Sequence, residues 1–358
     1  MLRNRSSRWH DEKGFTLIEV MIGFLVATVV ITAGFVVLTT TEKSTRANDQ
    51  VVETQQNARI AMEILSKDIK IAGFGMLPPP AAAITGPGGN CTIAGNAVPI
   101  VPIDQTSTAV DTGPDAIRLV IPLVGTTWNL QSAVGPAAFN QIQLVPGAVA
   151  DMQAAGLVNN SVISIGGAYS TPVNTLAPLT SQMNLVTPTV SPMAFPAGTR
   201  VFLLQCVTYD IGTTTGLCGG GNAPCLRRNG VSIAEGIEDL QLEYACDGCI
   251  TAVNGGVKDG IVDNQTGSTA GYDELDFLKD NLWNLAPVTP DKITMVRIFL
   301  VARQLTVDQG LGEVNAPGQL SAASLQVSDH TYATDQRLRR RTLTRTVETR
   351  NLGRFFGL

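Results

Sequence analysis

One carboxylate, Glu19, lies inside an almost wholly apolar run of 24 residues that extends from Phe15 to Leu38. A carboxylate at the centre of a membrane-spanning helix costs about 2.5–3.5 kcal/mol on insertion scales, and less near an end of the span. Glu19 is therefore either a tolerated interfacial acid or an acid that awaits a positive partner. Cleavage after Gly14 would create such a partner, the free amine of Phe15. A Glu19–amine pair between parallel helices in low dielectric would also set their axial register.

Six cysteines could form disulfides, bind zinc or act as a redox pair. They are Cys91, Cys206, Cys218, Cys225, Cys246 and Cys249. Their even number and the apolar segment upstream favour disulfides in an oxidising compartment over a zinc site, for which the gap between Cys218 and Cys225 is wide. Six cysteines allow 15 pairings, so spacing cannot decide between them. Short closures of Cys218 with Cys225 and of Cys246 with Cys249 are plausible. They would leave Cys91 to pair with Cys206.

The stretch DGCITAVNGGVKDGIVDN at 247–264 contains oxygen ligands that a calcium loop would need. With Gly260 at the sharp turn, Asp259 and Asp263 are suitably placed. Val257 and Gly255 then occupy positions that should carry Asp or Asn. The pattern favours a solvated turn over a calcium site, and we expect no metal or other cofactor.

Candidates for catalysis are few, because the chain has only two histidines, His10 and His330. Cleavage after Gly14 would remove His10, and His330 lies in a polar stretch typical of a solvated loop. The glycine-rich stretch at 216–224 lacks the Gly-Lys-Ser/Thr ending of a phosphate-binding loop, and we predict a flexible hairpin tip. We therefore expect a protein that is not an enzyme.

The stretch RLRRRTLTRTVETR at 337–350 is rich in arginine. In a strand its arginines would lie on both faces, with Arg339, Arg341 and Arg345 on one face and Arg340 and Arg350 on the other. No aromatic side chain lies among them to stack on bases, and the formal net charge of the chain is −5. Pairing with acidic neighbours or protein partners is favoured, and no nucleic acid is expected.

The apolar run and its flanks predict a membrane span that continues as an amphipathic helix. Residues 1–14 carry the cations that keep this end in the cytoplasm. Residues 15–38 would span roughly 36 Å as a helix, enough to cross a bilayer core of about 30 Å. Residues 39–77 keep a helical pattern until the prolines that follow Leu77 end it. We expect one helix of about 60 residues, 1.5 Å per residue.

The remaining residues, 78–358, have the pattern of a β-rich globular domain. Five stretches resemble strands; they are 116–124, 201–211, 237–246, 293–305 and 339–351. Residues 81–115 and 125–200 have the composition of loop-rich insertions. The predicted class is α+β, with a long N-terminal helix packed on an antiparallel sheet.

The sequence KGFTLIEVMI resembles the class III signal of type IV prepilins. In that family a basic leader ends in Gly, followed by Phe, a Thr-Leu-Ile type run, and Glu at the fifth mature position. Lys13, Gly14, Phe15 and Glu19 match these positions, as do the three residues between Phe15 and Glu19. The resemblance implies that prepilin peptidase cuts between Gly14 and Phe15 and methylates the new amine.

The stretches GIEDLQLEYACD, ITMVRIFLVAR and the arginine-rich strand ending in TRN resemble PilW-like minor pilins. The resemblance covers roughly 12–77 and 230–355, and none is found at 78–200. It implies a pilin-like fold and a place in a priming or tip complex of a type IV pilus. Implied partners are other minor and major pilins, prepilin peptidase and the inner-membrane assembly platform. The implied location is the inner membrane, with the C-terminal domain in the periplasm.

Three other interpretations stay open. A minor pseudopilin of type II secretion would share the N-terminal signature. A pilus-carried adhesin or DNA-capture module would use 78–200 as its binding region. A plain membrane-anchored protein would not be cleaved at Gly14.

Overall fold

The computed structural model describes most of the chain in two compact units, Met1–Gln50 and Val51–Leu358, and each is described by itself. The described residues are 14–77, 80, 82–103, 113–191, 193–213, 216, 218, 223–250, 254–262, 276–279, 283, 286–306, 324–333 and 338–351.

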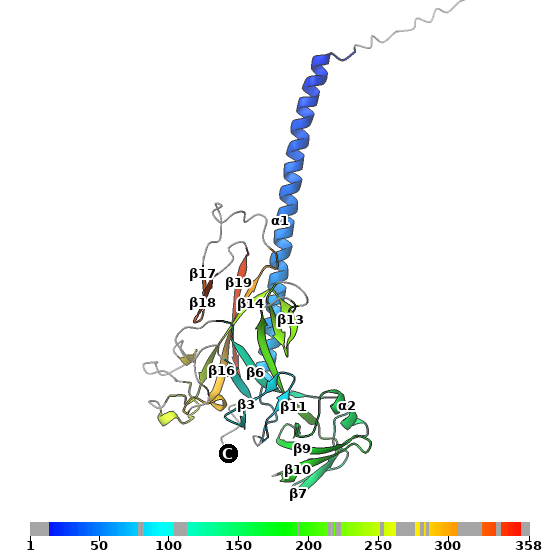
Figure 1. Cartoon of the computed structure of the whole chain (residues 1–358), viewed down its shortest axis with the longest axis vertical. Coiled ribbons are helices and arrows are strands. Elements are labelled where there is room, and N and C mark those ends of the chain that lie inside the picture. Colours follow the sequence, from blue (N-terminus) through cyan, green and yellow to red (C-terminus); the bar gives the residue numbers. More distant parts are fainter. Residues whose placement is uncertain are drawn as a thin grey trace, which may run out of the picture. The chain divides into compact units, whose positions relative to one another are not determined.

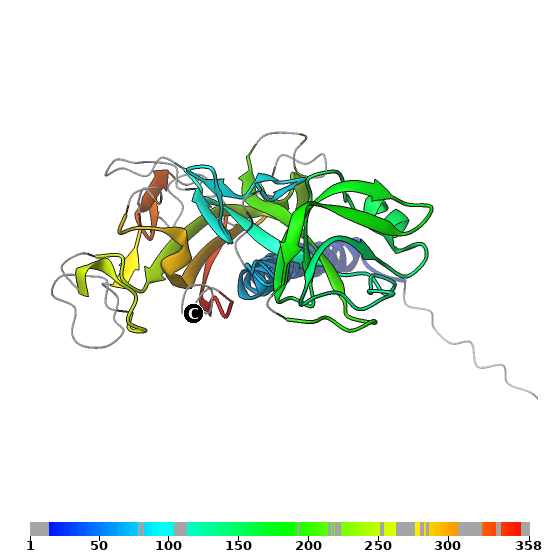
Figure 2. The same ribbon diagram turned by 90° about the horizontal axis from the view of Figure 1, so that it is seen from below.

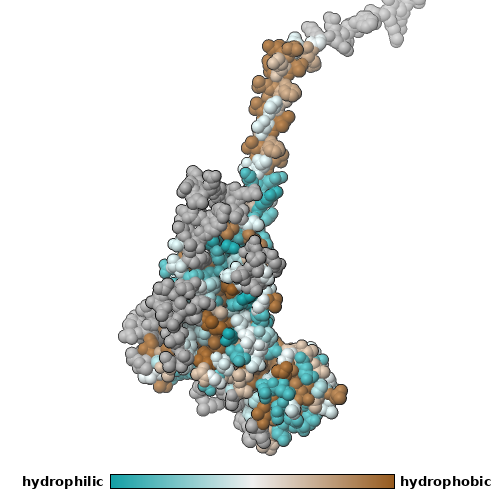
Figure 3. Space-filling view, viewed as in Figure 1, coloured by the Kyte–Doolittle hydropathy of each residue, from teal (hydrophilic) through white to brown (hydrophobic). Residues whose placement is uncertain are grey.

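The first unit consists of the N-terminal part of helix α1 (Leu17–Ile71), drawn in blue in Figure 1. Every residue from Gly14 to Leu38 is exposed, and hydrophobic residues dominate the visible surface of this segment in Figure 3. Hydroxyl groups are satisfied within the helix: Thr28 donates to the carbonyl of Phe24 and Thr32 to that of Thr28, both at 2.7 Å. The segment is long and apolar enough to cross a membrane. An apolar medium therefore suits it better than water.

The second unit contains the end of α1 and the remaining elements. In chain order they are β1 (Thr85–Gly86), β2 (Gly89–Asn90), β3 (Thr92–Ile93), β4 (Asn96–Ala97), β5 (Ile100–Ile103), β6 (Ala116–Leu123), β7 (Ala138–Gln143), α2 (Ala148–Ala154), β8 (Val162–Ile165), β9 (Tyr169–Ala177), β10 (Gln182–Val190), β11 (Val201–Gly212), β12 (Cys225–Arg228), β13 (Val231–Glu235), β14 (Ile237–Cys246), η1 (Asn254–Gly256), β15 (Phe277–Leu278), η3 (Pro290–Lys292), β16 (Ile293–Arg303), β17 (Ser324–Val327), β18 (His330–Ala333) and β19 (Arg340–Glu348).

A four-stranded antiparallel sheet in the order β15-β14-β16-β19 forms the C-terminal part of this unit. On β14 the even-numbered residues Leu240, Leu242 and Tyr244 join the core that contains Leu65 and Ile69 of α1. Figure 2 shows this part of α1 against the strands of the second unit. The predicted long helix and the predicted antiparallel sheet are confirmed, with the strand ends shifted by a few residues.

A nine-stranded sheet follows the order β13-β12-β11-β8-β9-β10-β7, and β6 pairs with both β11 and β5. The expectation of a loop-rich insertion at 125–200 was wrong. That region contributes β7, β8, β9, β10 and α2, which enclose a core of their own that includes Met152, Ile163 and Val173. The strands are hard to recognise in the sequence because their hydrophobic residues are interrupted by Thr, Asn and Pro. Their core is completed by Leu203 of β11.

Three disulfides link parts of the second unit, and they are the pairs named above as plausible, which the spacing alone could not decide. The bonds are Cys91–Cys206, Cys218–Cys225 and Cys246–Cys249. The first closes a sequence separation of 115 residues and fixes the segment of short hairpins at 85–97 to β11. In the chain-entropy account, such a long closure restricts the unfolded chain most.

A polar contact ties α1 to the nine-stranded sheet. The hydroxyl of Tyr209 on β11 donates to the Asp68 carboxylate at 2.5 Å. The Nε of Arg228 on β12 donates both to Asp68 and to the Tyr209 hydroxyl, each at 3.1 Å. Asp68 and Tyr209 are buried, so each depends on these partners. Burial, together with the negative charge of Asp68, raises the pKa of Tyr209 above its ordinary value.

We expect Tyr209→Phe to lower the free energy of unfolding by about 1–3 kcal/mol, because Asp68 and Arg228 each lose a bond in a buried setting. Because the pKa of Tyr209 is raised by folding, the stabilisation by its protonated hydroxyl is fully present below about pH 10. It is lost as the pH rises beyond that value. The difference in unfolding free energy between wild type and Tyr209→Phe should therefore be constant up to about pH 10 and shrink above it. Denaturant unfolding of the full chain in detergent measures it.

Tyr169→Phe is the matched control, because Tyr169 is half-buried beside Phe139 and its hydroxyl has no hydrogen-bond partner among the described residues. An equal loss in both variants, or no change with pH in their difference, would contradict the role assigned to the Tyr209 hydroxyl.

Candidate functional site

The peptide bond between Gly14 and Phe15 lies ahead of α1, which begins at Leu17. Gly14 is exposed, and Phe15 is 83% exposed. Neither residue belongs to a helix or a strand. The bond that the sequence singled out is therefore open to an approaching protease.

Thr16 and Glu19 form a capping box at the start of α1. The backbone N–H of Glu19 donates to the Thr16 hydroxyl at 3.3 Å. The Glu19 carboxylate accepts from the backbone N–H and the hydroxyl of Thr16, both at 3.4 Å. The Thr-x-x-Glu spacing is the signal for this motif, and it could have been recognised in the sequence. Glu19 therefore has a partner within its own helix.

The outer face of β14 carries a buried polar row, because alternate residues point away from α1. Asp239, Gln241 and Glu243 are all 3% exposed or less. Glu243 accepts from the hydroxyl of Ser328 at 2.6 Å and pairs with Arg297 at 3.2 Å. The Arg297 guanidinium also lies 3.6 Å from the ring centroid of Phe277. The turn between β17 and β18 is thus held on the sheet by polar contacts.

His330 corrects our expectation of a solvated loop residue. It begins β18, is 6% exposed, and its Nδ1 lies 3.1 Å from the Asp239 carboxylate. The partner is 91 residues away along the chain, which is why local sequence could not reveal it. His330 serves as a buried contact of the β17–β18 hairpin.

The loop after β14 is organised by one carboxylate and one ammonium. The carboxylate of Asp247 accepts the backbone N–H groups of Asp259 and Gly260, both at 2.9 Å. The Lys292 ammonium donates to three backbone carbonyls, those of Gly248, Gly256 and Pro287, at 2.7–2.8 Å. Burial lowers the pKa of Lys292, with the nearby Lys258 acting in the same direction.

Of the two calcium candidates, only Asp259 is described, and Asp263 lies outside the described residues. The Asp259 carboxylate accepts from the backbone of Ile261 at 2.9 Å. Among the described residues, no group of three acidic, histidine or cysteine side chains could hold a metal ion. Here the Lys292 ammonium occupies the position at which the loop carbonyls converge.

The predicted division of the arginines into two faces holds only in part, because Arg350 lies beyond β19 and is exposed like Arg341 and Arg345. Arg340 pairs with Glu238, with contacts of 2.5 and 3.0 Å, and Glu238 also accepts from Arg303. Arg341, Arg345 and Arg350 are exposed. Arg337 lies outside the described residues. Most of the glycine-rich stretch at 216–224 also lies outside them, but Cys218 and Cys225 are joined across it, between the paired strands β11 and β12.

Two family models match the chain, and together they cover the helix start and the C-terminal sheet. The model of the prokaryotic N-terminal methylation motif matches residues 9–35, which include Gly14, Phe15 and Glu19. The model described as Type IV Pilus-assembly protein W matches residues 208–351, from within β11 to just beyond β19. Over these ranges the chain matches a PilW-like type IV pilin. It is a minor pilin involved in type IV pilus assembly.

No curated protein matches the chain, and no solved structure does. In the core that α1 shares with β14, β16 and β19, the strand residues lie within the match to the pilus-assembly family, whereas the α1 residues lie outside both matches. Residues 36–207 lie outside both matches and contain the separate core of β7 to β10. As a pilin, the chain acts together with other components of the pilus.

In this PilW-like pilin we expect Lys292→Met to lower the free energy of unfolding by about 1–3 kcal/mol, because three carbonyls lose their shared donor. The loop should open first, so the backbone N–H groups of Asp259 and Gly260 should exchange faster with solvent deuterium. Lys67→Met is the control, since Lys67 is exposed and has no acidic partner among the described residues; its effect should stay within about 0.5 kcal/mol. Unchanged exchange at Asp259 in the Lys292 variant would show that the ammonium does not hold the loop.

Proposed function

We propose that this minor pilin is anchored in the bacterial inner membrane by residues 15–38, with its C-terminal domain in the periplasm, and that it enters the pilus after processing. Prepilin peptidase would cleave between Gly14 and Phe15 and methylate the Phe15 amine. The observation that carries the proposal is that every apolar residue from Phe15 to Leu38 is exposed. A surface of this kind needs lipid before assembly and other helices afterwards.

In the filament, the carboxylate of Glu19 would pair with the Phe15 amine of a neighbouring subunit. The carboxylate lies at the helix start, where its bonds to Thr16 are long. A methylated amine at Phe15 remains cationic and would be buried with the helices. A subunit out of register would leave that charge unpaired, which costs several kcal/mol.

The C-terminal domain would select neighbours in a priming or tip complex. Its proposed partners are the other minor pilins, the major pilin and the inner-membrane assembly platform. The proposed role is structural. His330 contacts Asp239, and Arg340 of β19 bonds to Glu238. Neither an enzymatic step nor a nucleic-acid ligand is part of the proposal.

The separate core of residues 128–203 favours a second candidate, an adhesive or DNA-capture module carried on the pilus. The hairpin between β9 and β10 exposes Leu179 fully. Loss of adhesion or DNA uptake with normal filaments would support this module. Loss of the filaments themselves supports the assembly role. A type II secretion pseudopilin is disfavoured by the match to the pilus family.

Mass spectrometry of the N-terminal peptide from membranes and sheared filaments tests the processing step. We expect a peptide that begins with methylated Phe15. The control is a strain without prepilin peptidase, in which the leader from Met1 should remain. An intact leader in a strain with active peptidase would make the segment an ordinary anchor.

A pair of substitutions at Glu19 separates charge pairing from helix capping. Gln at this position can still accept from Thr16 as a capping residue, whereas Ala cannot. If the charge matters, Glu19→Gln and Glu19→Ala should both reduce incorporation into sheared filaments at least about tenfold, since an unpaired buried charge costs about 3–5 kcal/mol. Membrane insertion, measured by resistance to alkaline extraction, should be unchanged. Normal incorporation of Glu19→Gln would show that only the cap is needed.

A further inference from the structure

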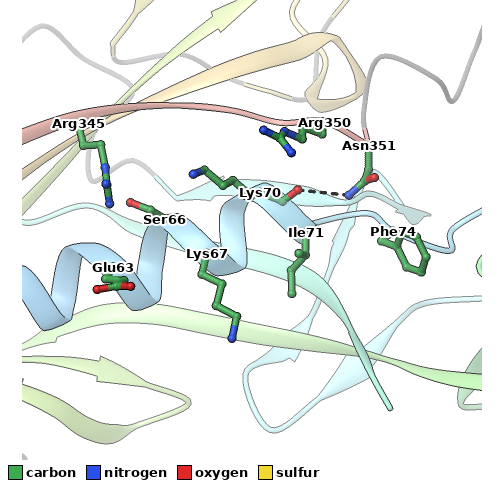
Figure 4. A pocket seen from close by; sticks show the side chains of 9 residues that line it. All are labelled: Glu63, Ser66, Lys67, Lys70, Ile71, Phe74, Arg345, Arg350 and Asn351. Atoms are coloured by element: carbon green, nitrogen blue, oxygen red, sulfur yellow. Dashed lines mark hydrogen bonds between the residues drawn. The ribbon is translucent and has the colours of Figure 1, made fainter.

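A cationic groove runs between the last turns of α1 and the end of β19, within the second unit (Figure 4). Its volume is about 610 Å³. The lining residues that matter here are Ser66, Lys67, Lys70, Arg345, Arg350 and Asn351. Figure 4 shows Arg345 and Arg350 on the strand side of the groove, and Lys70 extends from the helix toward the same space.

The charge of this groove is not neutralised within the described residues. Four cations line it, with Glu63 as the one carboxylate. Neither Lys70, Arg345 nor Arg350 has an acidic partner in the part of the chain that the structure describes. A cation in the last turn of a helix stabilises that helix, which accounts for Lys70. It does not account for Arg345 on β19 or for Arg350 just after this strand.

Ser66 provides an independent sign of a missing ligand. Ser66 is 2% exposed and lines the groove, yet its hydroxyl has no hydrogen-bond partner among the residues that the structure describes. Buried hydroxyl groups in proteins usually have a partner. An acceptor group in the groove would supply it.

The groove is held open before any ligand arrives. The side-chain amide of Asn351 donates to the carbonyls of Lys70 and Ala72 at 3.3 and 3.5 Å, which joins the end of β19 to the end of α1. Arg345 is fixed on β19 opposite Ile298 of β16. A preformed site loses less conformational entropy on binding.

We propose that this groove binds carboxylate side chains of an extended acidic segment on a neighbouring pilin subunit. Arginine binds carboxylates through paired hydrogen bonds, and the volume suits one or two side chains. One edge of β19 pairs with β16, and no described strand covers the other edge, so backbone groups are available to an extended segment. The inference rests on the proposed function, which brings pilin subunits into contact.

Nucleic acid fits the groove less well. The aromatic ring that lines it, Phe74, packs edge-on against Phe202 with ring centroids 5.4 Å apart. Phe74 is the one aromatic side chain among the lining residues, so the groove offers no series of rings on which successive bases could stack.

Binding of a synthetic peptide to the full-length protein in detergent tests the proposal. The probe is a fluorescent eight-residue peptide with Glu at alternate positions, and the matched peptide has Gln at those positions. We expect the Glu peptide to bind at least tenfold more tightly. Arg345→Glu combined with Arg350→Glu should abolish the difference between the peptides.

Arg341→Glu is the control, because Arg341 is exposed on the same strand and lies outside the groove. It should leave binding unchanged. Ser66→Ala should weaken binding about threefold without lowering the unfolding midpoint, since the hydroxyl has no partner to lose. Equal binding of both peptides, or equal loss in the Arg341 variant, overturns the proposal. Tighter binding of a short DNA duplex or of anionic phospholipid vesicles, lost in the same double variant, also overturns it.

In cells, the same double variant distinguishes a failure of the groove proposal from a failure of the proposed function. We expect Arg345→Glu with Arg350→Glu to be processed to a Phe15 start but incorporated poorly into filaments. Failure of processing in the wild type would instead refute the proposed function. Normal incorporation of the double variant would refute the groove alone.

Discussion

The second half of α1 is the constraint on which the rest of this pilin depends. Leu65 and Ile69 are fully buried, and both sheets supply the residues that cover them. Replacing a buried leucine or isoleucine with alanine typically costs about 2–5 kcal/mol of stability. The apolar stripe that contains Leu65 and Ile69 therefore contributes more to stability than any single polar contact in the unit. The helix therefore serves two environments. One stretch is enclosed by its own domain, while the other, from Phe15 to Leu38, presents apolar side chains that its own unit leaves exposed.

Polar contacts fix the one arrangement in which this apolar stripe of α1 packs against the sheets. Asp68 fixes α1 against Tyr209 and Arg228. On the other side of β14, the buried residues Asp239, Gln241 and Glu243 each bond to specific partners. Apolar packing tolerates small slips, whereas a misplaced carboxylate in these positions would be left unpaired. These residues thus add specificity more than net stability, because desolvation offsets much of the attraction within each pair.

The features predicted from sequence were those carried by long uninterrupted patterns. The alternation of 237–246 and the helical spacing before Leu77 depend on neighbours within one element, and both were recognised. Residues 125–200 were not, because their short strands share a core with β11 and α2 and so show little periodicity alone. His330 was missed for a related reason: its partner Asp239 is remote in sequence. The Thr16–Glu19 capping box was missed although its Thr-x-x-Glu spacing is a local signal in the sequence.

That capping box bears on how Glu19 can serve two partners. Its bonds to Thr16 are 3.4 Å long, beyond the usual range for strong hydrogen bonds. An N-terminal cap is worth about 0.5–2 kcal/mol, and a long one lies toward the lower end. Pairing a buried carboxylate with a buried amine is worth more than this cap, because breaking such a pair costs about 3–5 kcal/mol. The positive end of the helix dipole favours the ionised carboxylate in either arrangement. The cap therefore holds Glu19 at the helix start while the subunit is alone, and in the proposed assembly a neighbouring amine would displace it.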